Sequence, residues 1–159
     1  MLGGMGRPED PTRPSTPWFE AWRGVLYANA KVLRVAEIDL IERAGFPLTW
    51  LDVLAQLHDA PDNKLRMQEL QEGSLFTRSG MTRLVDRIEA GGLVRREPVA
   101  GDRRGVLVVL TPEGASRHSQ AFDEHLLVIE REFGRLLTPE QQDVIADALA
   151  GFWRDSRPE

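Results

Sequence analysis

Residues 74–111 constrain the fold most, because their hydrophobic pattern changes from helical to strand-like within one short segment. Four apolar residues recur at helical spacing: Met81, Leu84, Val85 and Ile88. Two glycines then mark the helix end, and Leu93–Glu97 and Val106–Leu110 have the composition of strands. The pattern predicts a helix of roughly Thr77–Ala90, followed by a β-hairpin whose long loop, residues 98–105, projects from the body.

The polar side of this helix and the hairpin loop carry groups that suit a nucleic acid. Hydroxyl and guanidinium groups near the N-terminus of the helix can bind base edges and phosphates: Thr77, Arg78, Ser79, Thr82 and Arg83. Arg78 and Arg83 are the first candidates for guanine, since a guanidinium can bond O6 and N7 together, although clamping a phosphate is the alternative for each. Ser79 and Thr82 suit phosphates better. A helix for the major groove beside a cationic hairpin tip is typical of a DNA-binding winged helix.

The charge distribution favours this interpretation more than the net charge does. The chain carries −5 overall, but residues 73–105 contain seven arginines and four acids, an excess of three positive charges. The rest of the chain therefore carries −8. Local charge governs contact with phosphates, while a distant acidic surface limits unspecific binding. A solvated basic face without a partner is the alternative.

Composition excludes several classes of protein. With no cysteine, the chain has no disulfide, thiolate metal site or cysteine nucleophile. It has no apolar run of about 18 residues, so we expect no membrane span, and its first 16 residues resemble a disordered lead-in rather than a secretory signal. Its three histidines are far apart in sequence, and we expect His118 and His125 to be surface residues. No catalytic constellation, metal site or cofactor motif is present, so we expect no enzyme.

The remaining segments are predicted to be helical. Thr16-Pro17, Thr111-Pro112 and Thr138-Pro139 each place a side-chain acceptor at the N-cap and a proline at the first helical position. Gln141 can complete a capping box with Thr138. The expected helices are residues 17–43, a second that starts after the cap candidate Thr49 and stops at Pro61, a third of roughly 66–72, and a last one of 138–155.

The helices at the two ends carry apolar surface that a small central module cannot cover. Between residues 112 and 138, a heptad-like seam is formed by Phe122, Leu126, Ile129, Phe133 and Leu136. A second copy of the chain is the simplest cover, with folding back on the same chain as the alternative. The expected organisation is a lead-in (1–16), an N-terminal dimerisation helix (17–46), a winged helix-turn-helix lobe (47–111) and C-terminal dimerisation helices (112–159).

Two motifs are similar to the MarR family of bacterial winged helix-turn-helix transcription regulators. LVDRIEAGGLVRREPVAGDRRGVLVVLTPEG, residues 84–114, resembles the end of that family's recognition helix, its wing and the entry to the next helix. LTWLDVLAQL, residues 48–57, resembles its second helix. The resemblance implies a mainly α fold with a small β-hairpin wing (α+β).

The resemblance also implies a function. It implies a cytoplasmic, nucleoid-associated homodimer on double-stranded DNA, with half-sites roughly 34 Å apart in a near-palindromic operator. Repression relieved by a small-molecule effector is the implied outcome. A winged-helix module that binds protein rather than DNA is the alternative.

The resemblance assigns roles to particular residues. In the Asp-x-Arg wing, Asp102 braces the loop, Arg104 inserts into the minor groove, and Arg103 can share either task. Weaker phosphate candidates are Lys64, Arg66, Arg87, Arg95 and Arg96; Arg87 can instead pair with Asp86 or Glu89, and one of Arg95 and Arg96 can pack over an acid. Candidates to line an effector pocket are Trp22, Tyr27, Trp50 and His58, with plain packing as the alternative for each aromatic residue.

Overall fold

The computed structural model describes residues 16–72, 77–99 and 101–154, without the side chains of residues 103, 104, 153 and 154. The lead-in of residues 1–15 therefore lies outside the described part. The described elements are α1 (Pro17–Ala44), α2 (Leu48–Asp59), η1 (Pro61–Asn63), β1 (Lys64–Arg66), α3 (Met67–Glu72), α4 (Arg78–Ala90), β2 (Val94–Val99), β3 (Asp102–Leu110), α5 (Pro112–Glu132), η2 (Gly134–Leu136) and α6 (Pro139–Arg154).

Two of the three predicted threonine caps are confirmed. Thr111 Oγ1 accepts a hydrogen bond from the Gly114 amide at 2.9 Å. Thr138 Oγ1 accepts from the Gln141 amide at 3.3 Å while Gln141 Oε1 accepts from the Thr138 amide at 2.9 Å, which completes the capping box. Thr16 is the N-cap of α1 and Pro17 its first residue, as predicted, but the Thr16 side chain makes no capping hydrogen bond with the described residues, because the Phe19 amide donates to the Thr16 carbonyl instead.

The start of α2 also differs from the prediction. The helix begins at Leu48, with Pro47 at the N-cap, so Thr49 lies inside its first turn. The Leu48 amide donates to the Glu37 carboxylate of α1 at 2.8 Å. A side chain from another helix therefore satisfies this half-buried amide, which is why no local cap is needed.

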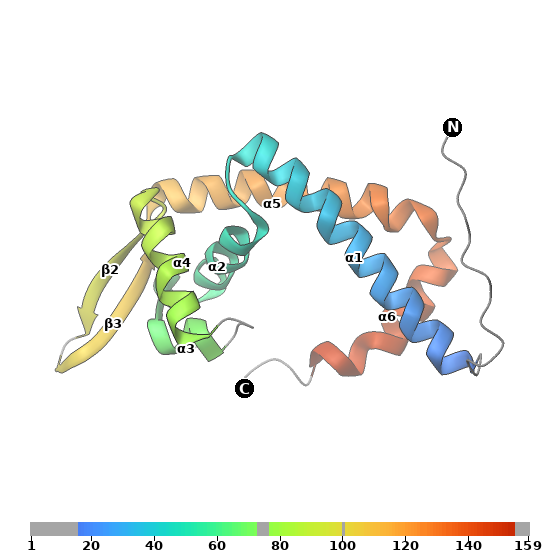
Figure 1. The fold of residues 1–159 in the computed structure, drawn as a ribbon, viewed down its shortest axis with the longest axis horizontal. Helices are drawn as coiled ribbons and strands as arrows, with labels where there is room; N and C mark the ends of the chain where they lie inside the picture. The colour runs from blue at the N-terminus through green and yellow to red at the C-terminus, as the bar shows by residue number, and fades with distance from the viewer. Residues whose placement is uncertain (1–15, 73–76, 100, 155–159) are drawn as a thin grey trace.

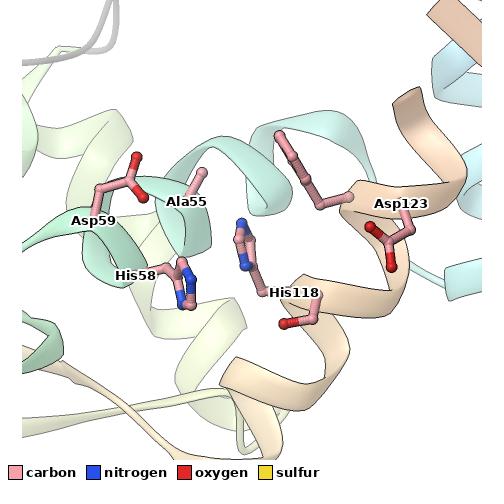
Figure 2. Close-up of a pocket in the computed structure, with 7 residues that line it drawn as sticks. Ala55, His58, Asp59, His118 and Asp123 are labelled. Atoms are coloured by element: carbon pink, nitrogen blue, oxygen red, sulfur yellow. The ribbon is translucent and has the colours of Figure 1, made fainter.

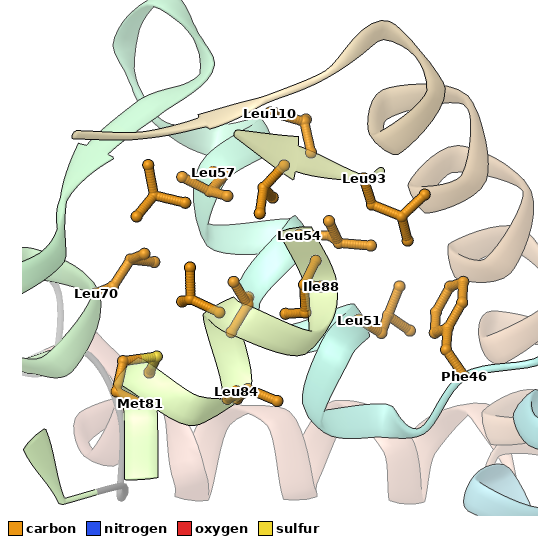
Figure 3. Close-up of a cluster of buried hydrophobic side chains, with 14 of the residues drawn as sticks. Phe46, Leu51, Leu54, Leu57, Leu70, Met81, Leu84, Ile88, Leu93 and Leu110 are labelled. Carbon is orange, nitrogen blue, oxygen red and sulfur yellow. The ribbon is translucent and has the colours of Figure 1, made fainter. Parts of the chain in front are cut away.

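The core lies in the central lobe, where α2, α3 and α4 pack under the sheet (Figure 3). The apolar face predicted for the fourth helix is confirmed, since Met81, Leu84, Val85 and Ile88 are all buried. Their main partners are the equally buried residues Leu51, Leu54, Leu57, Leu70, Leu93, Val108 and Leu110. This packing determines which side of α4 is left to face the solvent.

The sheet contains three antiparallel strands in the order β1-β3-β2. Strand β1, which pairs Leu65 with Val108, was not predicted because three residues are too short to show a period. The prediction of a long loop in the wing is wrong. Strands β2 and β3 continue almost to the tip, with a register shift at Pro98/Val99, and Gly101 turns the chain in the left-handed conformation at φ +79°.

The helices α1, α5 and α6 form arms beside the lobe, and α5 runs from the lobe into the arms (Figure 1). The predicted heptad seam does not lie on one helix, because α5 ends at Glu132, Phe133 is its C-cap and Leu136 belongs to the η2 turn. Every large hydrophobic side chain that the described structure leaves exposed belongs to this part, from Trp18 to Ile41 and from Phe122 to Phe152. Within the described residues, none of the helices combines the length and apolar character needed to cross a lipid bilayer.

Candidate nucleic-acid interface

The solvent side of α4 gathers the residues predicted to face a major groove. Thr77, the N-cap of this helix, accepts from the Gly80 amide at 3.2 Å, and Thr82 donates to the Arg78 carbonyl at 3.0 Å. All five predicted groove residues are exposed: Thr77, Arg78, Ser79, Thr82 and Arg83. Arg78 contacts Gln71 of α3 at 3.5 Å. Among the described residues, neither Arg83 nor the exposed Arg87 has an ion-pair partner, so both guanidinium groups are available to an anion.

Arg96 of β2 neutralises the two acids of this helix. Its guanidinium forms ion pairs with Asp86 at 2.8 Å and with Glu89, and it also donates to the Thr82 carbonyl. Its backbone amide donates to Glu89 as well, at 2.8 Å. These acids therefore pair with Arg96, which is only 24% exposed, and not with Arg87 as the sequence also allowed. As a result, the outer face of α4 presents its cations without free carboxylates among them.

Arg95, the neighbour of Arg96, points to the solvent side of β2 and pairs with Glu97 at 2.7 Å. Of this pair of arginines, Arg96 is thus the one that packs over acids, and Arg95 is the one left near the surface. Lys64 pairs with Asp62 at 3.0 Å, and both groups are exposed. Exposed pairs of this kind are weak and can be exchanged for a phosphate at little cost.

An ion pair between strands braces the wing next to its turn. Asp102, the first residue of β3, contacts Arg66 of β1 at 3.2 Å. A Cβ on Gly105 would lie 2.6 Å from the Asp102 carboxylate and 2.7 Å from Val99, so only glycine fits there without a shift. Arg103 and Arg104 belong to β3 by their backbone, but their side chains lie outside the described residues. Figure 1 shows the wing tip and the N-terminal end of α4 on the same side of the lobe.

The four predicted pocket residues are not brought together. Trp22 and Tyr27 lie on α1 and are 54% and 70% exposed, while Trp50 stacks on Phe46 and packs against Gly91. Of these four residues, His58 borders a cavity found in the described part of the chain (Figure 2). That cavity lies between α2 and α5, and sequence reasoning missed it.

The surface position predicted for His118 is wrong, because this residue is 5% exposed. Its ring lies 4.6 Å from that of His58 and 5.6 Å from that of Phe122, measured between centroids. Among the described residues, neither of its ring nitrogens has a hydrogen-bond partner. The helical spacing of the buried residues Gly114, His118, Ala121 and Val128 was the sequence signal for this face.

Burial shifts the titration of three groups between α2 and α5. It lowers the pKa of His118, assisted by the nearby His58 and opposed by Asp59. Burial also lowers the pKa of His125, which Asp52 opposes. The pKa of Asp52 is raised by burial and by Glu37, and lowered by His125. Both histidines are therefore held in the neutral form more strongly in the folded protein than in the unfolded chain.

These shifts predict that acid destabilises the fold. A histidine with a lowered folded pKa binds its proton more readily in the unfolded chain, so its stability contribution is complete above about pH 6.5 and is lost as the pH falls towards the folded pKa. Each proton bound only by the unfolded chain contributes a slope of up to about 1.4 kcal/mol per pH unit. Asp52 acts with the opposite sign: its stability contribution is complete below its ordinary pKa of 3.8 and is lost as the pH rises through its raised folded pKa.

Urea unfolding between about pH 5 and 7.5 measures this slope. We expect His118→Phe to reduce the slope and to raise the free energy of unfolding at neutral pH, because it removes two unpartnered nitrogens and keeps a ring. An unchanged slope in His118→Phe would show that His118 does not titrate in this window.

The chain resembles known proteins over most of its length. A sequence model described as the MarR family matches residues 44–105. The transcriptional repressor YetL of Bacillus subtilis is 34% identical over 101 residues, which cover 64% of this chain and 60% of YetL. The alignments to the curated relatives span between 42% and 62% of the length of those proteins.

Solved structures extend the likeness to both arms. AbsC, a MarR family transcriptional regulator from Streptomyces coelicolor, has a TM-score of 0.77 at 29% identity, over 91% of this chain and 97% of AbsC. Sco3205 from the same organism, a MarR family transcriptional regulator solved in complex with DNA, also has a TM-score of 0.77 at 29% identity, over 92% and 93% of the two chains. In its winged-helix lobe and its helical arms, the chain is similar to these MarR family transcriptional regulators.

Proposed function

We propose that the protein represses transcription by binding a near-palindromic operator as a homodimer. The observation that carries this proposal is the outer face of α4, where Arg96 neutralises both acids and leaves the exposed arginines without competing carboxylates. A positive face on a helix beside a hairpin tip matches the major and minor grooves of one duplex. The DNA complex of the related Sco3205 supports the proposal.

The proposal assigns a role to each of the candidate residues. Arg78 and Arg83 read guanines, while Ser79 and Thr82 bind phosphates. In the wing, Asp102 braces the hairpin next to its turn, and Arg103 and Arg104 enter or flank the minor groove. Arg87, Arg95, Lys64 and Arg66 supply further phosphate contacts. Arg96 is no longer a candidate for contacting a phosphate. Instead, it positions α4 and neutralises the two acids of that helix.

The homodimer part of the proposal is supported by the exposed apolar side chains of the arms. Trp18, Leu126 and Phe152 are 70%, 46% and 79% exposed, and the described residues of the lobe carry no comparable group. A surface of this kind is covered by an interface, and a second copy gives two lobes related by a twofold axis. We further propose that the protein acts in the cytoplasm. There, a small-molecule effector changes the spacing of the two lobes.

Selection of bound fragments from a random DNA pool tests the function directly. We expect an enriched near-palindrome whose half-sites lie roughly 34 Å apart, and sedimentation of a dimer on it. The logarithm of the affinity should fall by roughly 0.9 per phosphate contact for each unit of log salt. Failure to enrich any sequence, together with capture of a protein partner, would favour the protein-binding winged helix instead.

A further inference from the structure

Two glycines follow α4, and they are glycines for different reasons. Gly92 has a φ of +76°, in the left-handed region that glycine adopts most easily. Gly91 has a φ of −76° and a ψ of −3°, a right-handed conformation that any residue can adopt. The backbone conformation therefore explains Gly92, whereas the glycine at position 91 has to be explained by its surroundings.

The side chain next to Gly91 is the indole of Trp50, which belongs to α2. A Cβ on Gly91 would lie 3.1 Å from Cζ3 and 3.3 Å from Cη2 of this indole, and 3.3 Å from the Ile88 carbonyl oxygen. At such short distances a side chain at position 91 would push the indole and the helix end apart. The absence of a side chain at Gly91 thus lets α2 approach the C-terminal end of α4.

The Trp50 ring is also held by residues at the corner between α1 and α2. It stacks on Phe46, with ring centroids 5.9 Å apart and an interplanar angle of 12°. Phe46 is 3% exposed at the edge of the core (Figure 3), and the guanidinium of Arg117 from α5 lies 5.7 Å from its ring centroid. Arg117 also donates to the Ala44 carbonyl at the end of α1. Trp50 therefore connects this corner to the C-terminal end of α4.

The same end of α4 is tied to the start of α5 by hydrogen bonds. Thr111 Oγ1 donates to the Gly92 carbonyl at 2.8 Å, and the Thr111 amide donates to the Leu93 carbonyl at 3.0 Å. The apolar face of α4 fixes which side of the helix points inward, but apolar contacts are not directional. Close packing and hydrogen bonds at the C-terminal end therefore contribute most to the angle of the helix axis.

The residues proposed to read DNA lie at the other end of this helix. Arg78 precedes Gly91 by 13 positions, which is about 20 Å along the axis at 1.5 Å per residue. Over this length, a tilt of about 5° would move Arg78 by roughly 2 Å. A binding group has to be held within about 0.5 Å of its productive position. A small displacement at Gly91 is therefore enlarged where the bases are read.

We propose that Trp50 is a positioning residue for DNA binding, which sets the angle of α4 in the major groove through its contact with Gly91. The residue acts through α4 and does not touch DNA itself. This inference rests on the proposed function, and it gives a role to a residue that the sequence suggested for an effector pocket. A purely structural contact would affect stability alone, whereas a positioning contact affects the choice of DNA sequence.

Gly91→Ala tests the contact directly. We expect it to lower affinity for the operator selected from the random pool by about tenfold, which corresponds to one impaired base contact. Affinity for random-sequence DNA at the same salt should stay unchanged, because the charge of the protein is unchanged. Electrophoretic mobility shifts measure both affinities, and thermal unfolding checks that the variant is folded. Gly134→Ala, whose Cβ would meet Glu130 Cγ at an ordinary 3.7 Å, is the matched control and should change neither affinity.

A smaller ring at position 50 should rescue the loss. Trp50→Phe keeps a ring that can stack on Phe46, but it removes the second ring of the indole, to which Cζ3 and Cη2 belong. Trp50→Phe alone should reduce the preference for the operator, because the contact with Gly91 is lost. Combined with Gly91→Ala, it should regain most of the operator affinity that Gly91→Ala loses. A double-mutant cycle measures this coupling between the two positions.

The ratio of operator affinity to random-DNA affinity decides the outcome. If Gly91→Ala lowers the melting temperature but leaves this ratio unchanged, Trp50 is a packing residue and the proposal is overturned. Losses that simply add in the double variant would overturn it too. Should Gly91→Ala fail to fold, an unchanged ratio in Trp50→Phe would have the same consequence. In each of these cases the wild type still binds its operator, so the proposed function stands. A wild type that selects no DNA sequence would refute the proposed function, and the positioning role with it.

Discussion

The double variant Arg78→Ala, Arg83→Ala is expected to lose at least about 10³-fold in operator affinity while its melting temperature stays unchanged. Each arginine that contacts a base contributes about 1–3 kcal/mol, and a dimer contains two copies of both. Both side chains are exposed on α4, so their removal leaves no cavity in the core. Electrophoretic mobility shifts at fixed salt measure the loss.

The two single variants distinguish base reading from phosphate clamping. An arginine that reads guanine relaxes specificity at one position of the operator when it is removed. An arginine that clamps phosphate weakens all sequences equally and lowers the salt slope by about one per lobe. Arg135→Ala, an exposed arginine on η2 paired with Glu130, removes the same charge far from α4 and should leave DNA binding intact. Wild-type affinity in the double variant would end the assignment of α4 as the recognition helix.

The second large effect concerns folding: Gly114→Ala is expected to destabilise the protein by several kcal/mol. A Cβ at this position would lie 2.9 Å from the Leu93 carbonyl carbon and from Leu110 Cδ1, and closer still to the Leu93 carbonyl oxygen. Leu93 is held in place because its carbonyl accepts from the Thr111 amide at 3.0 Å. Backbone that is hydrogen-bonded cannot move aside at low cost, so the first turn of α5 must shift from the sheet.

Gly151→Ala provides the matched control. A Cβ there meets nothing within 4 Å, and the residue lies inside α6, where alanine is the better helix former by about 1 kcal/mol. Chemical unfolding should therefore move the two midpoints in opposite directions. Equal stability of Gly114→Ala and the wild type would show that α5 does not dock on Leu93 as described.

Helix identity was predictable where local signals were strong. The apolar face of α4 and the caps at Thr111 and Thr138 follow from spacing and side-chain chemistry within a few residues. Strand β1 was missed because its pairing with β3 connects residues more than 40 positions apart. The short turn of the wing was missed for a related reason: how far β2 and β3 remain paired depends on their register, not on the loop residues.

The residues of the candidate interface could be predicted from the sequence, but the ion pairs that they form could not. The sequence marked the arginines of residues 78–104, yet it could not tell which of them pair with acids. Arg96 reaches Asp86 and Glu89 only because β2 packs beside α4. The contact between His118 and His58 could not be predicted either, because the two residues are 60 positions apart in the sequence.

The sequence by itself determined which segments are helices, which face of α4 is apolar and where the positive charge is concentrated, since each of these depends on neighbours within a turn or two. The tertiary structure alone decided which charges are neutralised, how long the wing strands are and where a cavity opens between α2 and α5. These features depend on contacts between distant segments, and such contacts exist only after the core residues of the lobe have packed.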